Sequence, residues 1–423
     1  MNLIDKNIKL LLKSINDKGF FHLLSANVLI QLFAFASQLF VAGILSPDDI
    51  GRIKIIQTYL SIFSIVAGMG FNASTLKICS ENRTKKEKEN YFNAALVFTL
   101  LSSITVYAIV FILNLLGIIT KDSIIKVLIP IGLFPLITNS LFSLFTAFFQ
   151  SQKKIKLFST LTLINKILSI FLIIVFTYLL KIKGYFIAYN LSILTMVVMS
   201  FFLLKKEINF TFKLNKNLLK DHWAYAGSNT IAYIVSELTA YLDIILISFL
   251  VTDIKQIGYY SFALTLTVAL GIFPLTVQQI SIPYISSNIL NKKEFFTTFN
   301  KYNRILHVVV IVSLILFLMI MPLFISLVFQ GKYDNSLTYL NFLAVGWSIR
   351  NMNHLKSGAI FGLGKIHYNA YAGLVNLIAC IIVYPVLIYL FGLMGAAYAS
   401  IISGIVFYVS FTFYFHKTVN ETF

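Results

Sequence analysis

One stretch with the composition of a membrane span carries two cations and a histidine in its middle. The stretch LNFLAVGWSIRNMNHLKSGAIFGLGK runs from Leu340 to Lys365 and holds Arg350, His354 and Lys356. An unpaired cation at the centre of a bilayer costs about 2.5–3.5 kcal/mol on insertion scales. On a straight helix Arg350 and His354 fall within one arc of roughly 100°, which Lys356 extends. We therefore expect these side chains to face a wet cavity, an acidic partner or an anionic ligand.

Two alternatives stay open for these cations. Arg350 could form a purely structural ion pair, and Lys356 could extend its ammonium toward the cytoplasm. Glu237 and Asp243 are the only acids inside the predicted spans, and either could pair with Arg350 or with Lys166. Three intramembrane cations against two acids predict a mildly cationic interior. An anionic head group is the ligand that such an interior favours.

Polar residues recur at helical spacing in several other predicted spans. These stripes are Asn27, Gln31 and Gln38; Gln57, Ser61, Ser64 and Asn72; Ser159, Thr162, Lys166 and Ser169; and Asn229, Tyr233 and Glu237. Polar faces avoid lipid, so they line a wet cavity or form hydrogen bonds between helices. We therefore add Gln31 and Asn229 to the residues expected to line a cavity.

The composition predicts an all-α membrane protein with about twelve transmembrane helices. Of the 423 residues, 58% are hydrophobic and 12% are charged, and the mean hydropathy is +0.85. Apolar runs of roughly 20 residues, each long enough to cross a bilayer, recur along the chain. The predicted spans are 25–45, 58–76, 93–117, 125–148, 157–180, 184–203, 223–250, 259–284, 306–329, 338–361, 369–391 and 393–414.

The placement of the basic residues predicts the topology. With an even number of spans both termini lie on one side, and the loops of that side carry 23 of the 34 lysine and arginine residues. The positive-inside rule then places both termini in the cytoplasm. The net charge of +18 is thereby explained by topology and by contact with anionic lipid, and a nucleic-acid role has no support. The basic segment 7–24 is predicted to lie along the cytoplasmic interface.

Sequence repeats predict two lobes of six helices around a central cavity. DDIGRIKII after span one matches KQIGYYSFA after span seven, and two further pairs match in order at nearly the same separation. We expect an N-terminal lobe at 1–203, a cytoplasmic linker at 204–222 and a C-terminal lobe at 223–423. Repeats of this parallel kind place the substrate between the lobes.

No motif indicates an enzyme. The six histidines form no HxxxH or HExxH pattern, and no nucleophile elbow, P-loop or dinucleotide fingerprint is present. Cys79 and Cys380 are far apart and match no metal-binding pattern, so we expect two reduced thiols. No metal or other cofactor is expected. His354 is a weak candidate for proton handling.

The chain resembles the polysaccharide transporter family, the Wzx-type oligosaccharide flippases of the multidrug/oligosaccharidyl-lipid/polysaccharide exporter (MOP) superfamily. The resemblance rests on three features: the opening SANVLIQLFAFASQLFVAGILSPDDIGRIKIIQTYL, the stretch ELTAYLDIILISFLVTDIKQIGYYSFALTL, and the basic turns FQSQKKIK and FGLGKIHYN. It implies a V-shaped bundle in the bacterial inner membrane with a cationic central cavity, in which Gln278 of span eight is expected to contact a sugar. It also implies transfer of undecaprenyl-diphosphate-linked oligosaccharide repeat units, of O-antigen or capsule type, to the periplasmic leaflet.

The resemblance further implies membrane lipids as surroundings and other polysaccharide-assembly proteins as possible partners, with H⁺, Na⁺ or no ion driving transport. Two other functions are weighed against a flippase. A cation-coupled multidrug antiporter of the same superfamily would need a more acidic cavity, and a membrane polysaccharide polymerase would need a large periplasmic loop.

Overall fold

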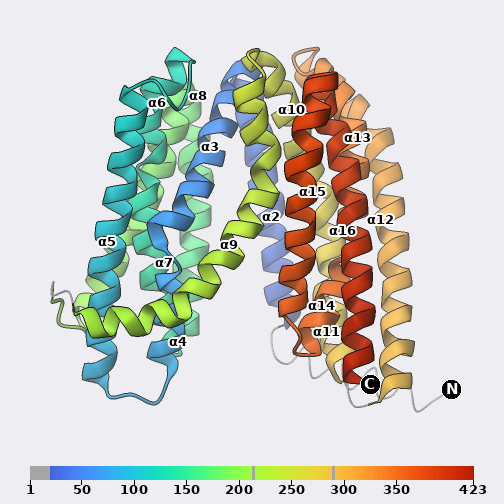
Figure 1. Ribbon diagram of the computed structural model, residues 1–423. Helices are drawn as coiled ribbons and strands as arrows, with labels where there is room; N and C mark the ends of the chain where they lie inside the picture. Colours follow the sequence, from blue (N-terminus) through green and yellow to red (C-terminus); the bar gives the residue numbers. More distant parts are fainter. Residues whose placement is uncertain (1–19, 212–214, 288–290) are drawn as a thin grey trace.

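The computed structural model describes residues 20–211, 215–287 and 291–423, and within these ranges the chain is helical and contains no β-strand (Figure 1). The helices are α2 (Phe20–Ile44), α3 (Pro47–Gly68), α4 (Phe71–Ser80), α5 (Lys85–Leu115), α6 (Ser123–Leu133), α7 (Pro135–Ser151), α8 (Ile155–Lys205), α9 (Lys216–Leu250), α10 (Ile254–Thr267), η1 (Val268–Gly271), α11 (Ile272–Ser287), α12 (Lys292–Phe329), η2 (Asp334–Ser336), α13 (Leu337–Asn351), α14 (His354–Gly362), α15 (His367–Phe391) and α16 (Leu393–Thr422). Residues 7–19 of the predicted interfacial segment lie outside the described residues.

Nine helical segments within the described ranges are long and apolar enough to cross a membrane. One of them, α8, contains two predicted spans, because its backbone leaves the helical conformation at Lys181 (φ 53°, ψ −137°). Helix α2 and the interrupted pair α13–α14 account for the other predicted spans. The prediction of an all-α protein with about twelve transmembrane helices is thus confirmed.

Helix α3 begins at Pro47, eleven residues before residue 58, where span two was predicted to start. The predicted first residue of span two is therefore wrong. Ser46 caps the helix, accepting a hydrogen bond from Asp49 N at 3.2 Å, and a proline follows it at the first helical position. Arg52 and Lys54, predicted to be loop residues, lie inside α3. The helix accommodates Arg52 because its guanidinium lies 3.2 Å from carboxylate oxygens of both Asp49 and Asp122.

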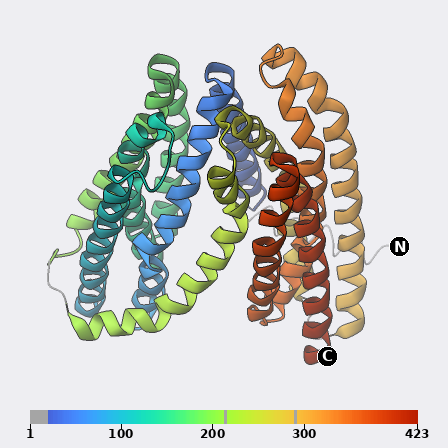
Figure 2. The same cartoon turned by 45° about the horizontal axis from the view of Figure 1, so that its top comes forward.

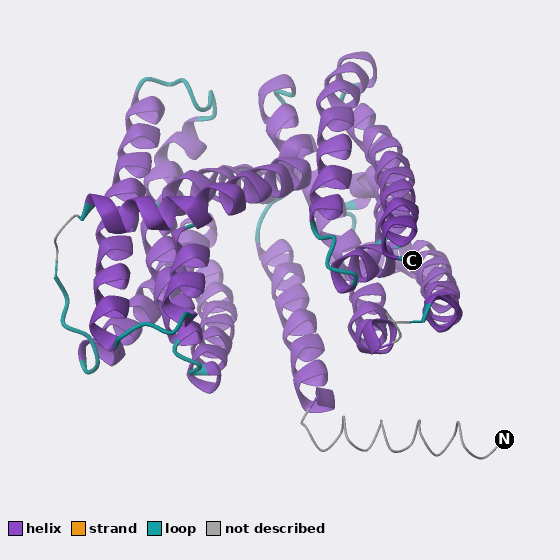
Figure 3. Cartoon of the chain, turned by 60° about the horizontal axis from the view of Figure 1, so that its bottom comes forward, coloured by secondary structure: helices purple, strands orange, loops and turns teal. Residues whose placement is uncertain are grey.

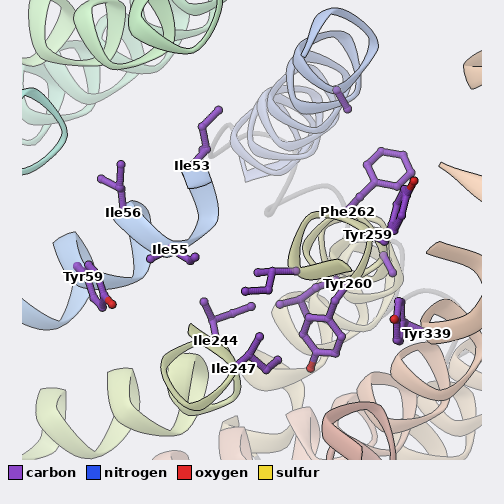
Figure 4. Packing of buried hydrophobic residues seen from close by; sticks show 14 of the residues in the cluster. Ile53, Ile55, Ile56, Tyr59, Ile244, Ile247, Tyr259, Tyr260, Phe262 and Tyr339 are labelled. Carbon is purple, nitrogen blue, oxygen red and sulfur yellow. The ribbon is translucent and has the colours of Figure 1, made fainter. Parts of the chain in front are cut away.

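Hydrophobic packing joins the two halves of the chain at one end only. The largest hydrophobic cluster draws on both halves, including Ile56 of α3, Ile244 of α9 and Phe262 of α10 (Figure 4). A second cluster contains only residues between 71 and 226, and a third only residues between 285 and 423. Figures 1 and 2 show the corresponding two groups of helices meeting at the top and diverging toward the bottom.

The end of α2 is tied to the C-terminal half at this junction. Tyr333 donates its hydroxyl to the carbonyl oxygens of Ala42 (3.1 Å) and Leu45 (3.2 Å). Lys332 donates to the carbonyls of Ala42 (3.0 Å) and Gly43 (2.8 Å). The last carbonyls of a helix have no partner within the helix, and a cation at that end is favoured by the helix dipole. The junction therefore satisfies polar groups as well as burying apolar ones.

Helix α9 belongs to both groups of helices. It runs beneath the N-terminal group and then rises into the junction, as Figures 1 and 3 show. Near its start, Trp223 packs edge-on against Phe71 (5.5 Å between ring centroids) and Phe98 (5.6 Å). Near its end, Asp243 accepts a hydrogen bond from Tyr260 of α10. The first turns of α9 fall within the predicted linker, so the predicted boundary between lobes lies inside one continuous helix.

Candidate functional site

The polar stripe of α3 lines two adjoining cavities. Gln57 lines one cavity, Ser64 and Asn72 line the other, and Ser61 lines both. The stripe continues past the end of α3, where Met69 (φ 43°) and Gly70 (φ 70°) turn the chain into α4. The side chains that the sequence placed on one helical face therefore form a continuous polar wall.

The first cavity, which we call the Glu237 cavity, has a volume of about 320 Å³. Its polar lining consists of Ser61, Ser64, Asn72, Thr99, Asn139, Ser140, Ser143, Tyr189, Thr230, Tyr233 and Glu237. Glu237 is half-buried and is the only charged residue in this lining. It forms no ion pair within 4.0 Å with any cation of the described residues.

The second cavity, the Lys166 cavity, has a volume of about 470 Å³. Its polar lining consists of Gln31, Ser37, Gln38, Gln57, Ser61, Asn165, Lys166, Ser169, Tyr185, Tyr189 and Tyr241. Lys166 is the only charged residue in this lining. Gln31 and Lys166, both predicted to line a cavity, therefore lie in the same one.

Arg350 faces a much smaller polar pocket in the C-terminal half. This Arg350 pocket has a volume of about 30 Å³, room for roughly one water molecule. Its polar lining comprises Thr239, Asp243, Arg350, Tyr384, Ser400 and Ser403. The guanidinium lies 5.1 Å from the ring centroid of Phe407. With the Asn376 amide oriented to satisfy its neighbours, its oxygen accepts from Arg350 Nη2 at 3.0 Å.

Asp243 lies in the same pocket without a direct ion pair. Its carboxylate accepts hydrogen bonds from the Tyr260 hydroxyl (3.0 Å) and from the Ile244 N–H (2.7 Å), and the residue is 7% exposed. Within the described ranges no ion pair of 4.0 Å or less joins Asp243 to a cation. An ion pair between Asp243 and Arg350, one of the pairings that the sequence left open, is not formed; the two residues line the same pocket, and the guanidinium contacts Asn376 and Phe407. In these ranges no three His, Cys, Asp or Glu side chains are grouped as a metal site requires.

The helix expected to carry Arg350, His354 and Lys356 on one face is interrupted at Met352 and Asn353. His354 starts α14 and pairs through Nε2 with Asn351 Oδ1 at 3.1 Å. Lys356 is 5% exposed and donates to Thr412 Oγ1 at 2.6 Å. Its ammonium also lies 3.4 Å from the centroid of the Tyr408 ring. Lys356 is thus enclosed by α16, and neither faces the cavities described above nor extends toward the cytoplasm.

The two remaining predicted residues are Gln278 and Asn229. Gln278 of α11 donates its amide N–H to the His354 carbonyl at 2.8 Å, beside the interruption between α13 and α14. Its described contact is therefore structural support for an interrupted helix. The side chain of Asn229 lies outside what the structure describes.

Lys54 is an intramembrane cation that the sequence analysis missed. Its ammonium lies 5.6 Å from the ring centroid of Tyr241, which lines the Lys166 cavity. Positions 54, 57, 61 and 64 follow helical spacing, so Lys54 extends the polar stripe of α3 toward the junction. The signal that would have revealed it is the Ser-Pro-Asp-Asp start of α3 at residue 46.

At the opposite end of the molecule, a buried histidine fixes the first half of α9. His222 is 0% exposed, with Nδ1 2.8 Å from Ser74 Oγ and Nε2 3.0 Å from the Tyr91 carbonyl oxygen. Burial lowers the pKa of His222 to about 4, because desolvation penalises the imidazolium. The Tyr91 hydroxyl donates to Asp221 at 2.7 Å. These contacts hold α9 against α4 and α5.

Solved membrane transporters share this fold. The lipid II flippase MurJ in an inward closed conformation superposes with a TM-score of 0.76 at 16% identity, covering 93% of this chain and 90% of its own. An inward-facing MATE multidrug resistance transporter of the MOP superfamily superposes with a TM-score of 0.71 at 13% identity, covering 92% and 95%. An outward-facing MATE transporter gives 0.63 at 14% identity, covering 94% of each chain. The chain therefore has the fold of MOP-superfamily transporters.

The sequence itself matches a family model over most of its length. No curated protein shows significant similarity to the chain. The family described as "Polysaccharide biosynthesis protein" matches residues 17–289, a range that contains α2 to α11 and the linings of the Glu237 and Lys166 cavities. This match confirms the resemblance that the sequence motifs indicated. The chain belongs to the polysaccharide biosynthesis protein family.

Proposed function

We propose that this protein is a flippase that moves undecaprenyl-diphosphate-linked oligosaccharide repeat units across the bacterial inner membrane. The observation that carries the proposal is a pair of adjoining polar cavities, one with a lysine, in a transporter-like bundle whose halves share a core at one end only. A lipid-linked oligosaccharide needs hydrogen-bond partners for its sugars and a cation for its diphosphate. The surrounding lipid accommodates its polyprenyl chain.

In this proposal the diphosphate is held by Lys166 and Arg350. Lys166 borders the larger cavity, and Arg350 has a planar guanidinium that can form two parallel hydrogen bonds to phosphate oxygens. The Arg350 pocket is too small for a diphosphate, so Arg350 reaches the ligand only when that pocket opens. Such opening makes the contact transient, as a transporter that releases its substrate requires.

Transport proceeds by alternating access around the junction. The distribution of basic residues orients the divergent end of the bundle toward the cytoplasm. Substrate enters from the cytoplasmic leaflet, and the two halves then rock so that the junction opens toward the periplasm. In this proposal the two moving bodies are the lobes 1–203 and 223–423, and α9 is attached to both of them.

One observation favours a second candidate, a cation-coupled antiporter. The Glu237 cavity carries an acid and no cation, which suits a cationic guest. The adjoining Lys166 cavity carries a cation, which suits an anionic diphosphate. A lysine beside the ligand therefore favours the flippase over the antiporter.

The test uses the full-length protein in liposomes with a fluorescent undecaprenyl-diphosphate disaccharide. Quenching of the outer leaflet measures how fast the lipid crosses. Flipping well above that of empty liposomes supports the flippase. A rate equal to that of empty liposomes, together with efflux of a cationic dye, would establish the antiporter.

A further inference from the structure

The Glu237 and Lys166 cavities, which are lined by the N-terminal half and by α9, are adjacent and opposite in charge. They share Leu60, Ser61 and Tyr189 in their linings. The only charged lining residue is Glu237 in one and Lys166 in the other. A ligand long enough to occupy both therefore meets a cation at one end and a carboxylate at the other.

The Glu237 cavity has unused hydrogen-bonding capacity. Thr99 lines it at 1% exposure, and its buried Oγ1 has no partner among the described residues. The side-chain amide of Asn72 donates through Nδ2 to Ser143 Oγ at 2.8 Å. This hydrogen bond does not involve the amide oxygen of Asn72. A buried hydroxyl without a partner is costly, and a polar ligand or water that enters the cavity removes the cost.

The lining of the Glu237 cavity matches the chemistry of a sugar. Hydroxyl and amide groups provide donors and acceptors, and Tyr189 and Tyr233 add aromatic rings. The volume of about 320 Å³ can admit a sugar residue together with water. The carboxylate of Glu237 accepts hydrogen bonds from sugar hydroxyls and attracts a protonated amine.

We infer that Glu237 is a specificity-determining residue that favours neutral or amino sugars and disfavours sugars that bear a carboxylate. This inference rests on the proposed function, because it assumes a lipid-linked sugar as the ligand. Its physical basis is like-charge repulsion in a cavity whose lining, among the described residues, contains no cation to offset it. With the diphosphate at Lys166, the sugars extend along the stripe of α3 toward Glu237.

The experiment compares three synthetic undecaprenyl-diphosphate disaccharides whose second sugar is glucose, glucosamine or glucuronic acid. Their binding to the full-length protein in detergent is measured by competition with a fluorescent undecaprenyl-diphosphate disaccharide. We expect the wild type to bind the glucuronic acid compound at least about tenfold more weakly than the glucose compound. We expect Glu237→Gln to reduce that ratio to about two, and Lys166→Gln to weaken all three compounds alike.

The outcomes separate the inference from the proposed function. Equal binding of the glucose and glucuronic acid compounds by the wild type would overturn the inference while leaving the flippase intact. An unchanged ratio in a folded Glu237→Gln protein would do the same. Failure of all three compounds to compete would refute the flippase and the inference together. The wild-type ratio decides the matter even if Glu237→Gln does not fold, and Glu89→Gln is the matched carboxylate control outside the cavities.

Discussion

Gly51 of α3 and Gly258 of α10 pack directly against each other where the two halves of the protein meet. A methyl group on Gly51 would lie 2.9 Å from Gly258 N, and one on Gly258 would lie 1.8 Å from the Pro47 carbonyl oxygen. These two glycines are counterparts in the sequence repeat, so the repeat brings its own matching positions into contact. The helices approach so closely because neither residue has a side chain.

A side chain at Gly258 should therefore separate the two halves. Overpacking costs about 1–3 kcal/mol, and at this position the obstacle is backbone, which cannot rotate away. We expect Gly258→Val to lower the flipping rate at least about tenfold and to lower the melting temperature in detergent. Gly227→Ala is the control, because no atom lies within 4 Å of the added carbon. Normal flipping by Gly258→Val would show that this contact is not needed in the transport cycle.

Substitutions of Arg350 test whether the guanidinium contacts the substrate. We expect Arg350→Lys to retain partial flipping and Arg350→Ala to retain very little, since lysine keeps the charge but loses the planar fork. The measurement is flipping per copy of membrane-inserted protein, with the exposed Arg304→Ala as control. Wild-type flipping by Arg350→Ala would limit Arg350 to a structural role. Loss of the inserted protein would instead identify Asn376 and Phe407 as its essential partners.

Lys54 provides a prediction that the sequence alone did not offer. We expect Lys54→Gln to slow flipping about tenfold, because the contact of a desolvated ammonium with an aromatic ring contributes up to about 2 kcal/mol. Lys54→Arg should retain most of the activity, since it keeps the charge beside Tyr241 and Asp243. Lys121→Gln, an exposed lysine near the same end, serves as control. A Lys54→Gln protein as active as the control would remove Lys54 from the mechanism.

The buried His222 predicts a loss of stability in mild acid. Its pKa is about 4 in the folded protein and near 6.5 in an unfolded chain, so the unfolded state binds the proton more readily. The free energy of unfolding should therefore decrease as the pH falls from about 6.5 to 4, by at most about 3 kcal/mol. Melting temperatures of wild type and His222→Gln at pH 7.5 and 5 measure this effect. We expect a smaller decrease for His222→Gln, and His416→Gln, at an exposed site, should behave as wild type.

The helical class and the polar stripes could be predicted because both depend on local composition and periodicity. Gln57, Ser61 and Ser64 line the cavities as their spacing implied. Hydropathy alone could not reveal that α3 starts at its proline, because Arg52 interrupts the apolar run and its ion pair with Asp122 is formed 70 residues away. A hydropathy window covers only neighbouring residues, so it cannot detect that a charge is neutralised by a residue far away in the sequence.

The positions of Arg350 and Lys356 could not be predicted for a different reason. The wheel argument assumes a continuous α-helix, but α13 and α14 are separated at Met352 and Asn353, where the Asn353 N–H donates to the Arg350 carbonyl only three residues back. Lys356 then finds Thr412 and the Tyr408 ring on α16, contacts that depend on tertiary packing. A polar residue within a span indicated that a partner exists, but the sequence did not identify it.

Helix α9 is anchored at both ends to different halves of the protein, and Glu237 lies between the anchors. His222 and Trp223 fix its lower part to α4 and α5, while Asp243 and Ile247 fix its upper part within the junction. Because α9 is fixed to both halves, rotation of one half against the other must bend this helix between its two attachment points. If Glu237 contacts the sugar as we propose, bending of α9 would move its carboxylate and so couple sugar binding to the opening of the bundle.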